Sequence, residues 1–293
     1  MLSIKNNFRE FCTSYSYLDI KELIENFAIF GGYDSGSIEL DDDIFENIEQ
    51  NILNNYHSLK RKFCQNQDKN TLLQKIALGD RKEYAIYRSS SNISQIRGRV
   101  LQKELYQNNI IEKELTREII PKREKHRYVK KEFRRYVPED KFRFVKNFDR
   151  FWYTFIYPFS SELDNNIQKS CLENIKQGFD KFVSLTFEEL SNELIKEDIF
   201  RLNIIQSGGY WDIHTEYDIL AKKSNGRYIL GECKWTNQKV CKNELNKLKN
   251  KAKYLKFDIE QYALFSKNGF SKSLKKERNI LLFELKDFEY FRR

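Results

Sequence analysis

Residues 210–235 constrain the fold most, because two alternating runs in this stretch flank a turn. The first run, about Glu216 to Lys222, alternates polar and apolar residues, and so does the second, Arg227 to Trp235. Alternation with a period of two is typical of strands, and the intervening Lys223-Ser224-Asn225-Gly226 is a turn signal. The stretch therefore predicts a β-hairpin with carboxylates at the centres of both strands, at Asp218 and Glu232.

The length of the loop decides which residues face each other. A two-residue loop, Asn225-Gly226, would pair Asp218 with Cys233 and leave Asp218 and Glu232 on opposite faces. A three-residue loop, Ser224 to Gly226 with its glycine left-handed, pairs Lys223 with Arg227 and hence Asp218 with Glu232. We predict the three-residue loop, which places these two carboxylates about 5 Å apart at Cβ, with Lys234 one step along the same face.

Two carboxylates beside each other are costly, because like charges repel and each loses hydration. A divalent cation would relieve that cost. Mg²⁺ prefers oxygen ligands and often takes only one or two protein carboxylates. The pattern therefore predicts a site for Mg²⁺ or Mn²⁺ at Asp218 and Glu232, with Lys234 placed to orient water or to stabilise developing charge.

The same residues carry a family resemblance. Asp218, followed across the hairpin by Glu232-Cys233-Lys234, resembles the D…(D/E)xK signature of the PD-(D/E)xK, or restriction-endonuclease-like, nuclease superfamily. The wording E-Y-D-I-L-A and I-L-G-E-C-K-W is similar to the C-terminal domain of archaeal-type ATPases, although Tyr217 replaces the nominal proline. The resemblance implies that Asp218 and Glu232 hold the metal, that Cys233 lends its backbone carbonyl, and that Lys234 serves catalysis.

The superfamily also tends to carry a glutamate on the helix before the hairpin. Apolar residues at helical spacing predict an amphipathic helix over Phe179 to Ile195. Glu188 on this helix is therefore expected to be a third catalytic and metal-side carboxylate, and Glu216 a further assisting residue. The alternative for Glu188 is a solvated helix glutamate.

Composition narrows the function classes. Lys and Arg number 52 against 43 Asp and Glu, for a net charge of +9, which favours polyanionic partners such as nucleic acid. There is no apolar run of about eighteen residues and no signal-peptide core, so we expect a cytoplasmic protein without a membrane partner. The five cysteines and three histidines lack zinc-site spacing.

The middle of the chain predicts a DNA-binding module. Helices are expected over Thr71–Leu78, Glu83–Tyr87 and Ile93–Tyr106, followed by two strands, which is the order of a winged helix. The expected nucleic-acid contacts are Arg97, Arg99 and Lys103 on the third helix, and Lys122, Arg123, Lys125 and Arg127 in the wing. The alternative is a protein-contact module with a solvated charged face.

Together these patterns predict a mixed α/β protein in which a helical and winged-helix region precedes a restriction-endonuclease-like α/β core, a central mixed sheet flanked by helices. The expected divisions are an N-terminal helical segment over 1–65, a winged-helix-like domain over 66–150 and a nuclease-like domain over 160–293. An aromatic run over Asn147–Phe159 is expected to connect the last two. In the nuclease-like domain, a lysine-rich helix over Asn243–Leu255 would place Lys247 along a phosphate backbone.

The expected function is a metal-dependent DNA nuclease, a hydrolase that cleaves phosphodiester bonds in double-stranded or branched DNA. A non-enzymatic DNA-binding or regulatory protein on a nuclease-like scaffold is the alternative. No phosphate-binding G-x-x-x-x-G-K-[ST] loop occurs, so a subunit that works with an ATPase partner is a third reading. The sequence also leaves a homodimer open.

Overall fold

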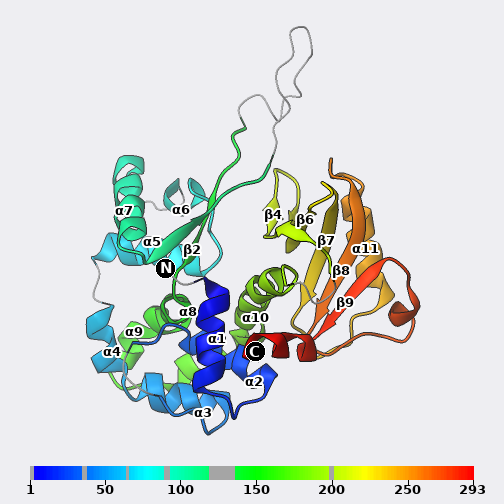
Figure 1. The fold of residues 1–293 in the computed structure, drawn as a ribbon. Helices are drawn as coiled ribbons and strands as arrows, with labels where there is room; N and C mark the ends of the chain where they lie inside the picture. The colour runs from blue at the N-terminus through cyan, green and yellow to red at the C-terminus, as the bar shows by residue number, and fades with distance from the viewer. Residues whose placement is uncertain (1–2, 35–37, 64–65, 89–92, 119–135, 198–200) are drawn as a thin grey trace. The chain divides into compact units, whose positions relative to one another are not determined.

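The fold is taken from a computed structural model, which describes residues 3–34, 38–63, 66–88, 93–118, 136–197 and 201–293. The chain divides into two compact units (Figure 1). Unit 1 contains residues 1–64, 146–209 and 217–293, and unit 2 contains residues 65–145 and 210–216. Each unit is described by itself below.

Unit 1 is built on a five-stranded mixed sheet with the order β3-β6-β7-β8-β9. The strands are β3 (Ile204–Gln206), β6 (Ile219–Lys223), β7 (Tyr228–Lys234), β8 (Ile259–Ser266) and β9 (Ile280–Glu284). The pairs β3–β6 and β6–β7 are antiparallel, whereas β7–β8 and β8–β9 are parallel. The expected mixed α/β class is confirmed.

Two helices cover opposite faces of this sheet. The long helix α10 (Lys169–Leu194) packs Phe187 against Trp235, with ring centroids 5.0 Å apart. The helix α11 (Lys242–Ala252) lies on the other face, where its Glu244 approaches Lys234 (Figure 1). Successive residues of a strand point to opposite faces, so β7 presents Cys233 to α10 and both Glu232 and Lys234 to α11.

The N-terminal helices of unit 1 pack with its C-terminal half. They are α1 (Ile4–Ser14), α2 (Ile20–Phe30), α3 (Ile44–Ile48), a π-helical turn η1 (Glu49–Leu53) and α4 (Tyr56–Lys62). Phe8 meets Phe291 of the terminal 3₁₀ segment η7 (Leu285–Arg292) at 5.6 Å between ring centroids, and the Tyr56 hydroxyl donates to Asp164. Aromatic contacts and hydrogen bonds over long sequence separation thus hold this unit together.

The aromatic connector is also part of the core of unit 1. It forms α8 (Asn147–Phe151), the π-helical η3 (Trp152–Ile156), the 3₁₀ turn η4 (Tyr157–Phe159) and α9 (Ser160–Asp164). Phe151, Trp152 and Tyr153 are all buried. These rings therefore pack inside the unit instead of forming an exposed stacking platform. Another short 3₁₀ turn, η6 (Leu274–Lys276), precedes β9.

Unit 2 has the expected order of three helices followed by a two-stranded hairpin. The elements are α5 (Gln67–Ala77), α6 (Ala85–Arg88), α7 (Gln95–Gln107), β1 (Ile111–Glu114) and β2 (Lys141–Phe144), and β1 and β2 pair antiparallel. Residues 210–216 return to this unit and contain β4 (Tyr210–Trp211) and the first residue of β5 (Glu216–Tyr217). Trp211 Nε1 donates to the Glu139 carbonyl at 2.9 Å.

Two expected elements differ in extent. The helix predicted from Phe179 begins ten residues earlier, at Lys169. The predicted strand from Glu216 to Lys222 is interrupted at Asp218, where β5 ends and β6 has not begun. The interruption has a physical cause, because β5 pairs with β4 and β6 pairs with β7, so the chain changes partners at this residue.

Candidate functional site

The β6–β7 hairpin has the register that the three-residue loop predicts. Ile219 pairs with Gly231 and Lys222 with Tyr228. The Lys223 N–H donates to the Arg227 carbonyl at 2.8 Å, and Gly226 has a φ of +84°. The paired residues end at Ile219, and continuing the register by one step brings Asp218 to Glu232, whose charge acts on the Asp218 carboxylate. The turn thus brings the two predicted carboxylates together.

Asp218 is held by a backbone contact from the opposite strand. Its Oδ2 accepts the Cys233 N–H at 2.7 Å, in place of a carbonyl of the neighbouring strand. In an antiparallel ladder the N–H and C=O of one residue point toward the same neighbour. The Cys233 carbonyl is therefore directed to the same side as the Asp218 carboxylate.

Glu232 and Lys234 form an ion pair on the opposite side of β7 from α10. Lys234 Nζ lies 2.6 Å from Glu232 Oε1 and 3.9 Å from Glu244 Oε2 of α11. A second lysine of α11, Lys251, places its Nζ 4.0 Å from Glu232 Oε2. Glu232 therefore has a lysine near each of its carboxylate oxygens.

The electrostatics of the site follow from these contacts. Burial and the nearby Glu232 charge raise the pKa of Asp218 to about 6. The hydrogen bond from the Cys233 N–H and the charges of Lys234 and Lys251 act in the opposite direction. Burial lowers the pKa of Lys234, but Glu232, Asp218 and Glu244 together bring it above its ordinary value. Lys234 is thus an ammonium group at neutral pH, whereas Asp218 is a carboxylate that gains from an added positive charge.

Helix α10 supplies the other wall of the site. The Asn192 amide donates to the Asp218 carbonyl at 2.9 Å and to the Glu188 carbonyl at 3.1 Å. The Cys233 thiol has a pKa well above its ordinary value because it is buried, with the charges of Asp218 and Glu188 acting in the same direction and a hydrogen bond with Ser191 opposing them. Glu188 therefore lies close enough to the hairpin to act on Cys233.

The donors for a metal ion are limited in number. Among the described residues, no three or more His, Cys, Asp and Glu side chains form a group that could hold a metal ion. The oxygens that converge at the hairpin are the carboxylates of Asp218 and Glu232 and the Cys233 carbonyl. Glu188 does not join these oxygens in a metal-binding group of the described residues, so its role as a further ligand stays a prediction.

Glu216 does not accompany Asp218. It forms an ion pair with Lys141 at 2.5 Å, within unit 2. The interruption at Asp218 breaks the alternation that would have placed both carboxylates on one face. Glu216 is thus engaged by Lys141, and its assisting role stays a prediction.

The predicted basic contacts fall into two groups. On α7, Arg97 pairs with Asp68 at 3.4 Å, Arg99 Nε donates to the Tyr87 hydroxyl at 3.3 Å, and Lys103 is exposed. On α11, Lys247 pairs with Glu244 at 2.7 Å. The expected wing contacts, Lys122, Arg123, Lys125 and Arg127, lie outside the described residues.

Three residues around the site were missed by the sequence reading. These are Lys251, Glu244 and Asn192. The helix of Lys251 and Glu244 was expected beside the site, but its rotation about its own axis depends on packing. Asn192 follows Glu188 by four residues, so the spacing i and i+4 on one helix face could have identified it.

Comparison with known proteins gives one match. Residues 152–254, about a third of the chain, match a family described as archaea bacterial proteins of unknown function. The matched segment contains α10, the hairpin and α11, and so all the residues of the hairpin site. No curated protein and no solved structure matches the chain. No helix in the described ranges is long and apolar enough to cross a membrane.

Proposed function

We propose that this protein is a metal-dependent nuclease that hydrolyses phosphodiester bonds in DNA. One observation carries the proposal: the hairpin brings Asp218 near Glu232, whose charge raises the pKa of Asp218, and Lys234 lies on the same strand as Glu232. A buried carboxylate whose pKa is raised by a second carboxylate is a common feature of functional sites. The resemblance to PD-(D/E)xK nucleases agrees with this reading.

The residues present fit a Mg²⁺ or Mn²⁺ ion. Asp218 Oδ2 accepts the Cys233 N–H, and the Cys233 carbonyl is directed to the same side as this carboxylate. Hard divalent cations take such oxygen donors and often only one or two carboxylates. The chemistry that the ion supplies when bound is Lewis acidity toward a phosphoryl oxygen and a lowered pKa for an attacking water.

Lys234 is assigned the stabilisation of charge on the reacting phosphate. Its raised pKa keeps it protonated, so it donates hydrogen bonds and does not accept a proton. The ion pair with Glu232 fixes the ammonium beside the carboxylates before substrate arrives. A preorganised cation of this kind stabilises a transition state without the cost of reorienting water.

DNA as the substrate is proposed from charge. The chain has a net charge of +9, and α11 beside the site carries Lys247, Lys249 and Lys251. In unit 2, α7 presents Lys103 together with the exposed Ile96 and Val100, a mixture that suits phosphate and base-edge contacts in a groove. Unit 2 would then supply affinity and unit 1 the reaction.

The deciding experiment is cleavage of labelled linear, single-stranded and branched DNA with Mg²⁺ or Mn²⁺. Lys234→Ala and Asp218→Ala are expected to lower the rate by at least about 100-fold while DNA binding is largely retained. Lys222→Ala is the matched control, since it removes the same charge from the other end of this hairpin. It should cleave like the wild type.

Two outcomes would contradict the proposal. Cleavage retained in Lys234→Ala would remove the role assigned to this lysine. Binding without cleavage on every substrate, with or without metal, would favour a DNA-binding protein on a nuclease-like scaffold or a subunit that needs an ATPase partner.

A further inference from the structure

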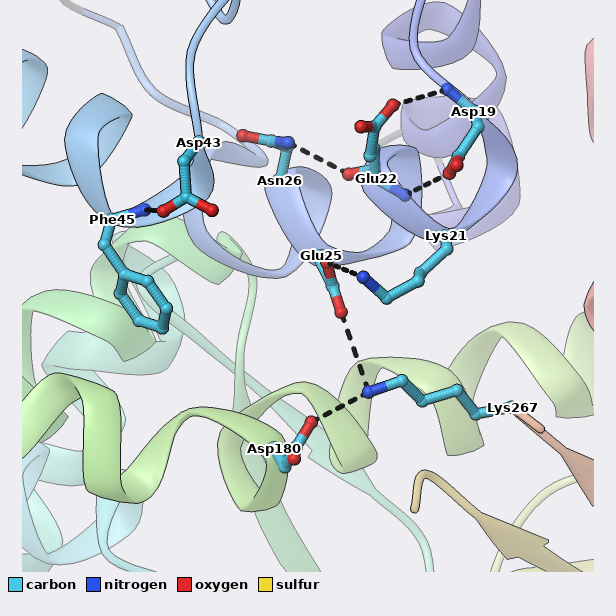
Figure 2. Close-up of polar contacts among 9 residues, drawn as sticks. All are labelled: Asp19, Lys21, Glu22, Glu25, Asn26, Asp43, Phe45, Asp180 and Lys267. Carbon is cyan, nitrogen blue, oxygen red and sulfur yellow. Dashed lines mark hydrogen bonds and ion pairs between the residues drawn. The ribbon is translucent and has the colours of Figure 1, made fainter. Parts of the chain in front are cut away.

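A cavity in unit 1, lined by residues other than those of the hairpin site, has a volume of about 370 Å³. It is formed by α2, the segment that begins α3, the first half of α10, and three residues outside these elements, Leu18, Asn237 and Lys267; Figure 2 shows part of this lining. The lining residues are Leu18, Lys21, Glu22, Glu25, Asn26, Asp42, Asp43, Ile44, Phe45, Lys176, Phe179, Asp180, Asn237 and Lys267. Its volume lies at the lower end of the range of small-molecule sites, about 300–1,000 Å³.

The floor of the cavity contains a charge network that is already satisfied. Lys267, whose side chain is 8% exposed, lies 3.0 Å from Asp180 and 3.8 Å from Glu25. Glu25 also pairs with Lys21 at 3.3 Å (Figure 2). These two lysines therefore have carboxylate partners, and the third, Lys176, lies over the Phe45 ring at 5.3 Å. An anionic ligand would have to displace these contacts.

Asn26 presents an acceptor that has no partner. Its side chain is buried, at 3% exposure, and its amide nitrogen donates to the Glu22 carbonyl at 3.0 Å. Its Oδ1 accepts no hydrogen bond among the described residues. In Figure 2 this oxygen points toward the segment that carries Asp43. A buried acceptor without a donor costs free energy, and a ligand N–H in the cavity would remove that cost.

Two further carboxylates, Asp42 and Asp43, line the rim of the cavity. Asp43 Oδ1 accepts the Phe45 N–H and Asp42 Oδ2 accepts the Gln50 amide, so one oxygen of each carboxylate is already used. Altogether five carboxylates and three lysines line the cavity. This excess of acid runs against the net charge of +9 of the whole chain. The cavity thus combines an unused buried acceptor with a local negative surplus.

We propose that this cavity binds a small organic cation that carries primary ammonium groups, such as a linear polyamine. One ammonium would donate to Asn26 Oδ1, and another would lie near the Asp42 and Asp43 carboxylates. A bare divalent ion is the competing ligand, and the titrations below distinguish it from an organic cation. This binding is independent of the nuclease proposal, which concerns other residues.

Spermidine is the probe, and calorimetric titration into the full-length chain is the measurement. Asp43→Asn removes one rim charge while keeping a residue that caps α3, and Asn26→Leu removes the buried acceptor. Each is expected to weaken spermidine binding by about tenfold, as for the loss of one charge-assisted or buried hydrogen bond. Asp258→Asn is the control, because Asp258 is an exposed carboxylate of unit 1 outside the cavity lining.

The proposal is supported if spermidine binds and both cavity variants weaken it while the control does not. It is overturned if spermidine does not bind, or if Asp43→Asn and Asp258→Asn reduce binding equally, which would indicate general charge attraction. Titrations with adenosine monophosphate and with Mg²⁺ alone are the remaining arms. Tighter binding of either, sensitive to Asp43→Asn or to Lys176→Ala, would also overturn the assignment of an organic cation.

Discussion

Two regions of unit 1 place carboxylates beside lysines, yet their charges are balanced differently. In the cavity network, Glu25 and Asp180 face Lys21 and Lys267, so that two carboxylates meet two lysines. At the hairpin, Lys234 lies against Glu232, and the direct partner of Asp218 is a backbone N–H. The first arrangement neutralises itself, whereas the second leaves a negative charge that an added cation would compensate.

The causes of the pKa shifts show the same difference. Burial raises the pKa of Glu25, and both lysines oppose that rise. Burial also raises the pKa of Asp218, but its next largest cause is the Glu232 charge, which acts in the same direction. A self-neutralised network suits a structural role, and a site with a carboxylate that no lysine pairs directly suits chemistry. Substitutions in the two regions should therefore affect stability with opposite signs.

The largest effect on stability is expected at Lys267. Lys267→Met would leave Glu25 buried without one of its two cations, and breaking a buried ion pair costs about 3–5 kcal/mol. Chemical denaturation measures the loss. Lys275→Met is the matched control, since Lys275 pairs with Glu284 on the surface and should change the free energy of unfolding by less than about 1 kcal/mol. Equal losses in both variants would show that the network is not structural.

At the hairpin, Asp218→Asn is expected to stabilise the protein. The neutral amide keeps an acceptor for the Cys233 N–H and removes the repulsion from Glu232. Without divalent metal near pH 7, the free energy of unfolding should rise by about 1–3 kcal/mol, the equivalent of one to two pKa units. Cleavage should be lost at the same time. A lower free energy of unfolding in Asp218→Asn would mean that the negative charge of Asp218 stabilises the folded protein.

The stability difference between Asp218→Asn and the wild type should depend on pH. The pKa of Asp218 is about 6 in the folded protein, against an ordinary value of 3.8 for an aspartate, so the folded state binds more protons between these two pH values. Stability from this group is fully present below about pH 4 and is lost as pH rises through about 6. The advantage of Asp218→Asn should therefore grow over this range.

Denaturation at about pH 4.5 and about pH 7 in a chelator tests this dependence. The wild-type curve alone does not isolate Asp218, because burial also raises the pKa of Asp149 to about 6. Taking the difference between the variant and the wild type cancels Asp149. If the difference in the free energy of unfolding between Asp218→Asn and the wild type is the same at both pH values, Asp218 does not titrate in this range.

The sequence predicted the parts of this site that local chemistry determines. The two alternating runs and the turn signal located the hairpin but left two loop lengths open, and the predicted three-residue loop is the one that the register shows. The order of helix, hairpin, helix and strands also followed from periodicity. These features depend on neighbouring residues, and so a local pattern carries them.

The features that were missed depend on contacts between distant segments. The interruption at Asp218 arises because β5 pairs with β4, and alternation does not reveal which strand is the partner. Lys251, not Lys247, is the α11 lysine that approaches Glu232, since the docking of the helix selects its face. The packing of Phe8 against Phe291 likewise follows from no local signal.

The smallest expected effect is at the turn that sets the register. Gly226 has a φ of +84°, and a Cβ added there would meet no atom within 4 Å. Gly226→Ala should therefore cost only backbone strain, about 1–2 kcal/mol, and Gly226→Asn less, because asparagine tolerates this conformation better. The paired residues from Ile219–Gly231 to Lys222–Tyr228 would still hold the register, so metal-dependent cleavage should survive in both variants.

Cleavage lost in Gly226→Ala while the protein stays folded would instead mean that the loop alone aligns Asp218 with Glu232. The hairpin site would then depend on its turn, in contrast to the cavity network, which side chains from three separate elements hold together.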